Sequence, residues 1–523
     1  MRGDESAALE AMAVRAQALR SLAPEQALTV GRAFVARSVE ARRAFADTQD
    51  GIRFGEVVRS GVSEHVAFLL AVCPDARAMC EREAFRVVEV ERALAMERER
   101  LDAADAPKVV AARLRLAAAH RRLASALAQG DAAALADARI EVTTRARDFR
   151  RLGGVDVGPG AAIDAALDAG WPEALAYVSY WFDDSLSVAF IRDRSGLRVV
   201  RLAASEAIEP LLMRFRRVIA NPRLPTTRAA AALGDEIFAP LGVSGYDRVA
   251  VSPQGLLHRV PFAALAVSDE GRPRSILEQH VITLTSGIDA ALNSTDTWQP
   301  TSVTIVAPDG GAAGAPLALA ANVVRELPAA ARDSIDWPDL AWASRETRAV
   351  AALFSEGATE LLLGSRSRLD ALMDSAVTSP PDVVHFATHG FVFEDAPSLS
   401  GLVLAAEADG TARLAGASEF RRLQLGARLV VLNGCRTVGA EHSTVTGYLG
   451  LRSAFVAGGA DEVVSTLWDV PDRAAADLVI EFYGHLRRGG VTSAEALRDA
   501  QRALQGTRYE HPYYWAGYSV FRG

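Results

Sequence analysis

The predicted fold rests on two stretches of the chain, Val-Val-His-Phe-Ala-Thr-His389-Gly390 and Leu-Val-Val-Leu-Asn433-Gly434-Cys435. Each begins with a short apolar run that is typical of a buried strand, and each ends at a residue that can do chemistry. The segment between them leaves room for one intervening strand and its connections. We therefore expect His389 and Cys435 to stand at the carboxyl ends of two neighbouring parallel strands.

The sequence around these stretches alternates between strand-like and helical segments. The predicted strands are Val303–Ala307, Thr359–Leu363, Val383–Ala387, Leu402–Leu404, Arg428–Asn433, Glu462–Leu467 and Tyr514–Phe521. The predicted helices are Ser344–Phe354, Ser367–Met373, Tyr448–Ala457, Arg473–Arg487 and Ser493–Leu504. This alternation predicts an α/β fold with a mostly parallel sheet covered by helices on both faces.

The preceding part of the chain has a different character. Residues 6–151 are rich in Ala, Leu, Arg and Glu at helical spacing and predict about six helices, with breaks at Pro24, Gly51, Pro74, Pro107 and Gly130. A degenerate repeat array and a plain bundle both fit this pattern. After the turn-rich stretch Gly153–Gly160, the segments Leu175–Phe182, Ser185–Ile191 and Leu197–Leu202 predict an antiparallel meander. A helix and a strand near Asp247–Gly255 are expected to follow.

Composition excludes several classes of function. The chain has 523 residues, half of them hydrophobic, a formal charge of -8 and no apolar run long enough to span a membrane. The mixed charges give no cationic field for nucleic acid, so we expect a soluble, cytoplasmic protein that contacts neither nucleic acid nor membrane. Three cysteines, Cys73, Cys80 and Cys435, are too few for a disulfide framework, and we expect the first two to be small core residues.

The pair His389 and Cys435 suggests nucleophilic catalysis. A cysteine thiol is only a few per cent ionised at neutral pH, and an adjacent imidazole base raises that fraction. The backbone N–H groups of Gly390 and Cys435 would form the oxyanion hole. Taken singly, His389 could cap a turn and Cys435 could be a buried apolar residue. Neither a metal nor a cofactor is expected, because the His385 to His389 spacing lies in a strand and lacks the glutamate of a zinc motif.

Six ordered motifs between about Pro172 and Gly523 resemble the CHAT domain, a caspase-like family in the caspase, separase and gingipain clan of cysteine peptidases. They are Val-Ser-Pro-Gln-Gly-Leu-Leu-His-Arg-Val-Pro-Phe-Ala-Ala-Leu265, Val-Val-His-Phe-Ala-Thr-His-Gly390, Asn-Gly-Cys-Arg-Thr437, Gly-Tyr-Leu-Gly-Leu-Arg-Ser-Ala-Phe-Val-Ala-Gly-Gly459, Ser-Thr-Leu-Trp-Asp-Val-Pro-Asp472 and His-Pro-Tyr-Tyr-Trp-Ala-Gly-Tyr-Ser-Val-Phe521. The resemblance implies that His389 is the general base and Cys435 the nucleophile. It also implies three domains: a helical domain (1–155), a protease-like non-catalytic half (156–300) and a caspase-like catalytic half (301–523).

The resemblance also suggests where a substrate binds. Asn433-Gly434 stands where family members commonly have Ser-Ala, which changes the wall of the substrate pocket. The run from Ser465 through Trp468 and Asp469 to Asp472 resembles separase, whose relatives prefer arginine at P1, so these residues and Asn433 are the predicted substrate-binding set. Capping of the following helix explains the aspartates equally well, and packing in the core explains Trp468 equally well.

These features predict a regulated cysteine endopeptidase that cleaves a specific protein. The resemblance implies a role in prokaryotic defence or cell death, with a gasdermin-like or neighbouring-gene protein as substrate and an activator bound by the N-terminal helices. The alternatives are a catalytically silent caspase-like scaffold for protein–protein interaction and an acyltransferase or ligase that uses the same dyad.

Overall fold

The computed structural model describes most of the chain outside one long and several short segments. The described residues are 2–42, 49–72, 77–101, 159–308, 317–318, 340–378, 380–391, 400–405, 412–423, 425–434 and 450–523. Cys73, Cys435 and the predicted helix breaks at Pro107 and Gly130 lie outside these residues.

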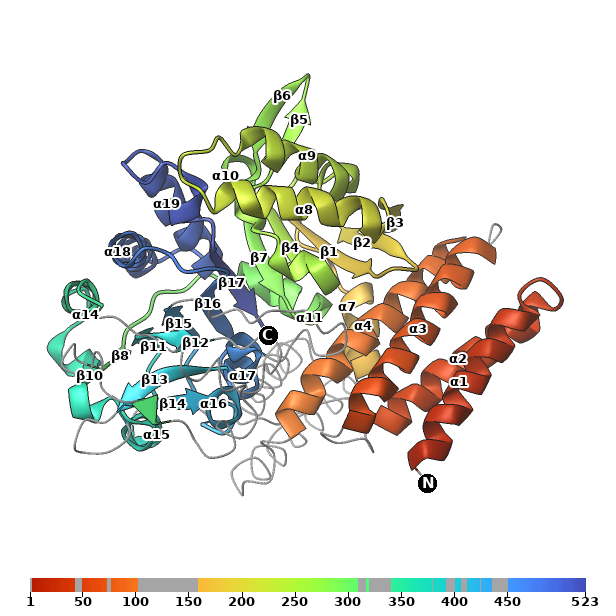
Figure 1. Cartoon of the computed structure of the whole chain (residues 1–523), viewed down its shortest axis with the longest axis horizontal. Coiled ribbons are helices and arrows are strands. Elements are labelled where there is room, and N and C mark those ends of the chain that lie inside the picture. Colours follow the sequence, from red (N-terminus) through yellow and green to blue (C-terminus); the bar gives the residue numbers. More distant parts are fainter. Residues whose placement is uncertain are drawn as a thin grey trace, which may run out of the picture.

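A mixed sheet of eleven strands runs through the described part of the chain, in the order β10-β8-β11-β15-β16-β17-β7-β4-β1-β2-β3 (Figure 1). Its strands are β1 (Leu175–Phe182), β2 (Ser187–Asp193), β3 (Gly196–Arg201), β4 (Arg248–Ser252), β7 (Val281–Thr285), β8 (Val303–Ala307), β10 (Thr359–Leu363), β11 (Val383–Ala387), β15 (Leu429–Asn433), β16 (Glu462–Thr466) and β17 (Tyr518–Arg522). A second sheet joins β12 (Gly390–Phe391), β13 (Gly401–Ala405), β14 (Ala412–Gly416) and β9 (Leu317–Ala318), and β5 (Ala266–Asp269) pairs with β6 (Arg272–Ser275).

The large sheet consists of two halves joined by the C-terminal strand. We call β10, β8, β11, β15 and β16 the His389 half, and β7, β4, β1, β2 and β3 the Tyr177 half. All neighbours within the His389 half are parallel, as are β7, β4 and β1. Because β17 is antiparallel to β16 and parallel to β7, the parallel strands of the two halves end at opposite edges of the sheet.

Helices cover both faces of the sheet. Their bounds are α1 (Arg2–Leu19), α2 (Pro24–Arg42), α3 (Gln49–Val72), α4 (Arg77–Leu101), α7 (Pro159–Asp168), α8 (Ser205–Ile219), α9 (Thr227–Ile237), α10 (Ile276–Gln279), α11 (Ile288–Leu292), α14 (Ala343–Ala351), α15 (Leu369–Thr378), α16 (Ala417–Phe420), α17 (Leu451–Ala457), α18 (Asp472–Arg488) and α19 (Ser493–Gln505). Consecutive residues of β11 show the two layers. The His385 ring meets Tyr483 of α18, while Phe386 stacks on Phe420 of α16 and Phe455 of α17.

The N-terminal helices help to form the core of the Tyr177 half. Alternate residues of β1 point to opposite faces: Val178 and Tyr180 pack with α8 and α9, whereas Tyr177 and Trp181 pack with residues of α3, α4 and α7. Figure 1 shows α3 and α4 beside this half. Because β1 is buried along its whole length, the helical segment supplies one of the two apolar covers that the strand needs.

The predicted fold class, a mostly parallel sheet between helices preceded by an all-α segment, is confirmed. Four predicted strands have the observed bounds, namely β1, β8, β10 and β11. The predicted strand at Leu402–Leu404 is β13, which pairs antiparallel in the second sheet instead of joining the alternation. Two helices, α8 and α9, follow the meander in place of one, and β7 and the β5–β6 hairpin were not predicted. The last strand begins at Tyr518 because Pro512–Tyr514 forms a 3-10 turn.

Two further expectations concern the N-terminal region. Gly51 lies inside α3, so a helix break there is wrong, whereas α2 begins at Pro24 as expected. Cys80 is buried, as predicted for a core residue, but it is also disulfide-bonded, which was not predicted. Sequence spacing alone does not show which sulfur atoms come within bonding distance. Among the described residues, no helix is both long and apolar enough to cross a membrane.

Candidate functional site

The two predicted stretches form neighbouring strands. β11 and β15 pair in parallel with Ala387 opposite Asn433, so both chains leave the sheet at the same edge. Thr388, His389 and Gly390 follow β11, and Gly434 follows β15. The strands themselves are fully buried, because α14 and α18 cover one face and α15, α16 and α17 the other. This is the edge where parallel sheets gather functional groups.

Gly434 packs directly against the segment that carries His389. A Cβ atom built on Gly434 would lie 2.3 Å from the Thr388 carbonyl oxygen and 3.3 Å from the Gly390 nitrogen. The Thr466 hydroxyl, at the end of β16, donates to the Gly434 carbonyl at 3.1 Å. Only a residue without a side chain fits here, so glycine is required by close backbone approach.

The second sheet fixes the position of His389. Its carbonyl accepts a hydrogen bond from the Val403 N–H at 2.9 Å, and the Thr388 hydroxyl donates to the Val403 carbonyl at 2.6 Å. Gly390 starts β12 and pairs with Leu402. His389 is buried, at 9% exposure. Cys435, predicted as the nucleophile and as an oxyanion donor, lies outside the described residues, so its distance from His389 remains a prediction.

Asn433 belongs to a buried polar cluster. Its Nδ2 donates to Glu346 Oε1 and Oε2 at 2.7 and 2.6 Å, and its Oδ1 accepts a hydrogen bond from the Tyr518 hydroxyl. His385 Nε2 lies 2.9 Å from Glu346 Oε1. Glu346 is 1% exposed and His385 fully buried. His385 therefore contacts a carboxylate, and within the described ranges no group of three His, Cys, Asp or Glu side chains could hold a metal ion.

Of the other predicted substrate-binding residues, Ser465 lies near the end of β16, and Trp468, Asp469 and Asp472 follow this strand. Ser465 is buried in β16, and its hydroxyl has no hydrogen-bond partner among the described residues. Trp468 is half-buried and donates through Nε1 to the Tyr513 carbonyl at 2.8 Å. Asp469 is exposed, while Asp472 begins α18 and accepts the Trp342 N–H at 2.8 Å. The structure thus gathers these residues at one edge, and direct contact with a substrate remains a prediction.

The CHAT domain family model matches residues 227–523. This chain belongs to the CHAT domain family. The match confirms the resemblance stated from the motifs, and it covers the whole His389 half together with α9, β4, β7 and β17 of the described elements. The meander β1 to β3 and the described helices α1 to α4, α7 and α8 precede the matched range.

Similar proteins include tetratricopeptide repeat protein 28 of Homo sapiens, 29% identical over 233 residues, and its Mus musculus counterpart, 28% identical over the same length. Each match covers 37% of this chain and 9% of the relative, so the CHAT chain spans about a tenth of the length of these relatives. Among solved structures, two of the Saccharomyces cerevisiae separase–securin complex match with TM-scores of 0.48 and 0.46 at 8% identity. Both cover 94% of this chain and 37% of the other chain.

The corresponding edge of the Tyr177 half of the CHAT chain is filled by α4. Glu89 of α4 accepts hydrogen bonds from the hydroxyls of Tyr177 and Ser179 at 2.9 and 2.6 Å, and from the Ile288 N–H at 2.8 Å. Arg92 donates to the Pro253 carbonyl at 2.9 Å and to the Tyr180 carbonyl. Burial raises the pKa of Glu89, and the nearby Arg92 opposes the shift.

Helix α4 also contacts α17, the helix that begins at Leu451 after the segment carrying Cys435. His258 lies between these elements. Burial lowers the pKa of His258 well below its ordinary value, and the positive charges of Arg452 on α17 and Arg92 on α4 lower it further. The N-terminal helices therefore contact the family-matched region near the far end of the Cys435 segment.

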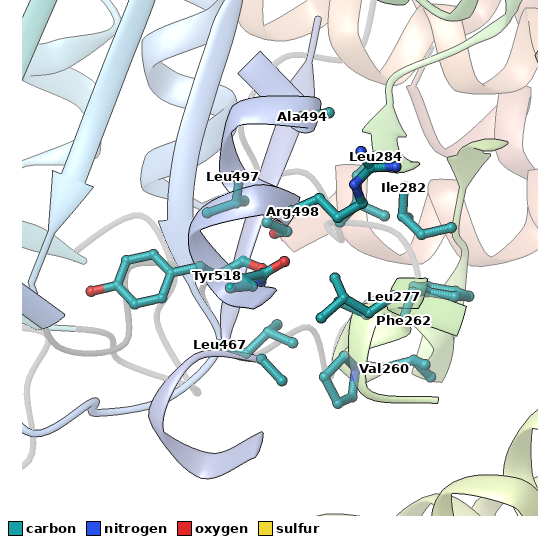
Figure 2. Close-up of a pocket in the computed structure, with 15 residues that line it drawn as sticks. Val260, Phe262, Leu277, Ile282, Leu284, Leu467, Ala494, Leu497, Arg498 and Tyr518 are labelled. Carbon is teal, nitrogen blue, oxygen red and sulfur yellow. The ribbon is translucent and has the colours of Figure 1, made fainter. Parts of the chain in front are cut away.

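A small pocket lies where the two halves meet. Figure 2 shows Leu497 and Arg498 of α19 on one side and Val260, Phe262 and Leu277 on the other. Its volume is about 30 Å³, which leaves room for a few water molecules at most. The pocket is too small for a peptide side chain and belongs to the joint between the halves.

Sequence reasoning missed Glu346, Tyr518 and the steric role of Gly434. Glu346 carries a weak signal, since it occupies the buried side of a short amphipathic helix where an apolar residue is expected. Tyr518 lies inside the sixth of the motifs quoted above, but its link to Asn433 was not visible because the two residues are 85 positions apart in the chain.

Proposed function

We propose that this CHAT chain is a cysteine endopeptidase in which Cys435 is the nucleophile and His389 the general base. The observation that carries the proposal is the contact between Gly434 and the Thr388–Gly390 backbone. Gly434 directly precedes Cys435 in the sequence, so the last described residue before the proposed nucleophile lies against the His389 segment. A buried imidazole with a fixed main chain, next to the residue that precedes a cysteine, supports a dyad.

The reaction would follow the chemistry of cysteine peptidases. His389 takes the proton of the Cys435 thiol, and the thiolate sulfur attacks the carbonyl carbon of the scissile peptide bond. The N–H groups of Gly390 and Cys435 would donate to the oxyanion, a contribution of about 3 kcal/mol for each donor. Protonated His389 gives its proton to the leaving amine as the C–N bond breaks. Water, deprotonated by His389, then hydrolyses the thioester and restores the thiol.

Asp469 is the better candidate for a P1 arginine. Asp472 already accepts the Trp342 N–H, and Arg473 and Arg345 stack on the Trp342 ring with their Cζ atoms 4.5 and 5.3 Å from its centroid. Asp469 is exposed, where a substrate guanidinium can reach it. A peptide library should favour arginine at P1, and Asp469→Asn should reduce that preference more than Asp472→Asn. A preference for leucine or aspartate would rule out the idea.

The dyad is tested by incubating the protein with the products of neighbouring genes and locating any cut site by mass spectrometry. His389→Ala and Cys435→Ala should each lower the cleavage rate at least a thousandfold without changing the melting temperature, because the dyad acts as a unit. His485→Ala, a partly exposed histidine of α18, serves as the matched control and should cleave normally. Undiminished turnover in either dyad variant would defeat the assignment.

A regulatory partner of the N-terminal helices is part of the proposal, with a role in prokaryotic defence or cell death and a gasdermin-like or neighbouring-gene substrate. Its support is the position of α4, which binds the Tyr177 half through Arg92 and contacts α17. A partner that displaces α4 would alter the support of α17, the helix that follows the Cys435 segment. A bound activator should therefore raise the cleavage rate of the intact chain, measured with and without each neighbouring protein.

A further inference from the structure

A buried carboxylate lies beneath the end of β15 and has no place in the dyad chemistry. Glu346 of α14 is 1% exposed, and it is surrounded by His385 of β11, Asn433 of β15 and Tyr483 of α18. Burying a charge costs several kcal/mol unless donors satisfy it. A well-packed apolar residue would be at least as stabilising at this position, so stability does not account for the carboxylate.

Polar side chains of two neighbouring strands face the Glu346 carboxyl group. Asn433 Nδ2 lies 2.7 and 2.6 Å from the two carboxylate oxygens, and His385 Nε2 lies 2.9 Å from Oε1. Neither ring nitrogen of His385 makes a well-aligned hydrogen bond to a described residue, so Nε2 meets Oε1 through a short contact only, and Asn433 supplies the hydrogen bonds. Burial raises the pKa of Tyr483, and the nearby Glu346 raises it further.

The cluster fixes the orientation of the Asn433 amide at both ends. Its Nδ2 points to Glu346 of α14, and its Oδ1 accepts from the Tyr518 hydroxyl of β17. Asn433 is the last residue of β15, and Gly434 and Cys435 follow it. Side chains of α14, which packs on one face of the sheet, and of β17, two strands away from β15, therefore hold its carboxyl end. A rotation of the amide would exchange donor and acceptor and break both contacts.

We propose that Glu346 is a positioning residue for the nucleophile: through Asn433 it holds the end of β15, and hence the start of the Cys435 segment, against the His389 segment. This inference rests on the proposed peptidase function. A displacement of about 1 Å at a reacting group can lower the rate a hundredfold. Hydrogen bonds that fix the end of the strand would therefore preserve the rate of the reaction. Glu346 does not touch the substrate in this role.

The test uses the full-length protein and exchanges the carboxylate and the amide between positions 346 and 433. Glu346→Gln replaces a carboxylate that only accepts by an amide that also donates, so one of its contacts to Asn433 and His385 is lost. Asn433→Asp places two carboxylates face to face, which is strongly unfavourable. In the double variant, Glu346→Gln with Asn433→Asp, the amide at position 346 can donate to the carboxylate at position 433. The second carboxylate oxygen at position 433 can still accept the hydrogen bond from the Tyr518 hydroxyl.

We expect Glu346→Gln to lower kcat tenfold to a hundredfold with KM changed less than about twofold, because the nucleophile is misplaced and the substrate site is intact. The rate of Cys435 alkylation by iodoacetamide, read by mass spectrometry, should change in the same variant. Asn433→Asp should lower kcat further, and the double variant should recover at least tenfold over Asn433→Asp. Thr347→Val, the neighbouring buried residue of α14 whose hydroxyl has no partner among the described residues, is the control and should match the wild type.

The outcomes separate this inference from the proposed function. A wild-type protein that cleaves nothing defeats the peptidase itself. A wild-type protein that cleaves, with a Glu346→Gln variant of equal kcat and alkylation rate but lower melting temperature, shows that the cluster only stabilises the fold. A double variant no better than Asn433→Asp also overturns the inference, because pairing between positions 346 and 433 is then irrelevant to turnover.

Discussion

The two halves of the sheet differ in what occupies the carboxyl ends of their parallel strands. In the His389 half, His389 follows β11 and Gly434 follows β15, and the neighbours there are the second sheet and Thr466. In the Tyr177 half, the region where β1, β4 and β7 end is filled by α4, whose Arg92 and Glu89 bond to it. One half thus presents residues suited to chemistry, and the other provides a docking platform for the N-terminal helices.

The difference shows that strand topology alone does not make a site. Backbone carbonyls and N–H groups at the ends of parallel strands need partners in either case. Arg92 satisfies two carbonyls in the Tyr177 half, and a buried cation with a buried carboxylate beside it leaves no access for a ligand. In the His389 half the backbone at the strand ends is paired within the sheet system instead, His389 through the Val403 N–H and Gly434 through the Thr466 hydroxyl.

The largest loss of stability should come from removing the Arg92 contacts in the Tyr177 half. Arg92→Met leaves Glu89 buried without its nearest cation and two carbonyls without their donor, so we expect a loss of about 3–5 kcal/mol in the free energy of unfolding. Urea denaturation measures it. Arg77→Met, an exposed arginine of the same helix paired to Glu81, should change stability by less than about 0.5 kcal/mol. Equal effects of the two variants would show that α4 does not anchor the Tyr177 half.

An intermediate effect is expected for Gly434→Ala in the His389 half. The added Cβ would lie 2.3 Å from the Thr388 carbonyl oxygen, so β15 and the His389 segment must separate. We expect a loss of about 1–3 kcal/mol in stability and a larger, roughly hundredfold, loss of cleavage rate. Gly484→Ala in α18, where the added methyl meets nothing within 4 Å, should gain up to about 1 kcal/mol. Normal cleavage by Gly434→Ala would refute the close approach.

The smallest effect should be on the pH dependence of the unfolding free energy, through His258 near α4 and α17. Because burial holds the pKa of His258 well below 6.5, the unfolded chain takes up a proton below pH 6.5 that the folded chain does not. The folded state therefore loses about 1.4 kcal/mol per pH unit below 6.5 from this group, and none above it. His258→Gln should remove this dependence. The unfolding free energy of the wild type minus that of the variant should decrease as the pH is lowered from 7.5 to 5. A difference that stays constant over this range would contradict a buried, neutral His258.

Local pattern predicted the bounds of four strands, three of which (β1, β8 and β11) are buried along their whole length. β1, β8, β10 and β11 are short apolar runs between turn residues, and their bounds follow from the sequence. β13 has the same local appearance, yet it belongs to the second sheet, since its pairing is set by β12 and β14. Hydrophobic periodicity and strand propensity identify a strand, but the strands that it pairs with depend on contacts that the local sequence does not encode.

The candidate site divides in the same way. His389 and the place of Cys435 after a strand are visible in the chain, because functional groups at strand ends follow apolar runs directly. The cluster of Glu346, Asn433 and Tyr518 is not visible, because its members come from α14, β15 and β17 and meet only across the folded sheet.

By itself, the sequence determined the fold class, the CHAT family and the positions of most strands along the chain, because apolar periodicity and ordered motifs are local properties of the chain. The tertiary structure decided that the N-terminal helices complete the core of the Tyr177 half, that Gly434 abuts Thr388, and that Glu346 holds Asn433. These are contacts between residues far apart in sequence, and hydrogen bonds and steric contacts act over only a few ångströms. They exist only once the sheet has brought the residues together.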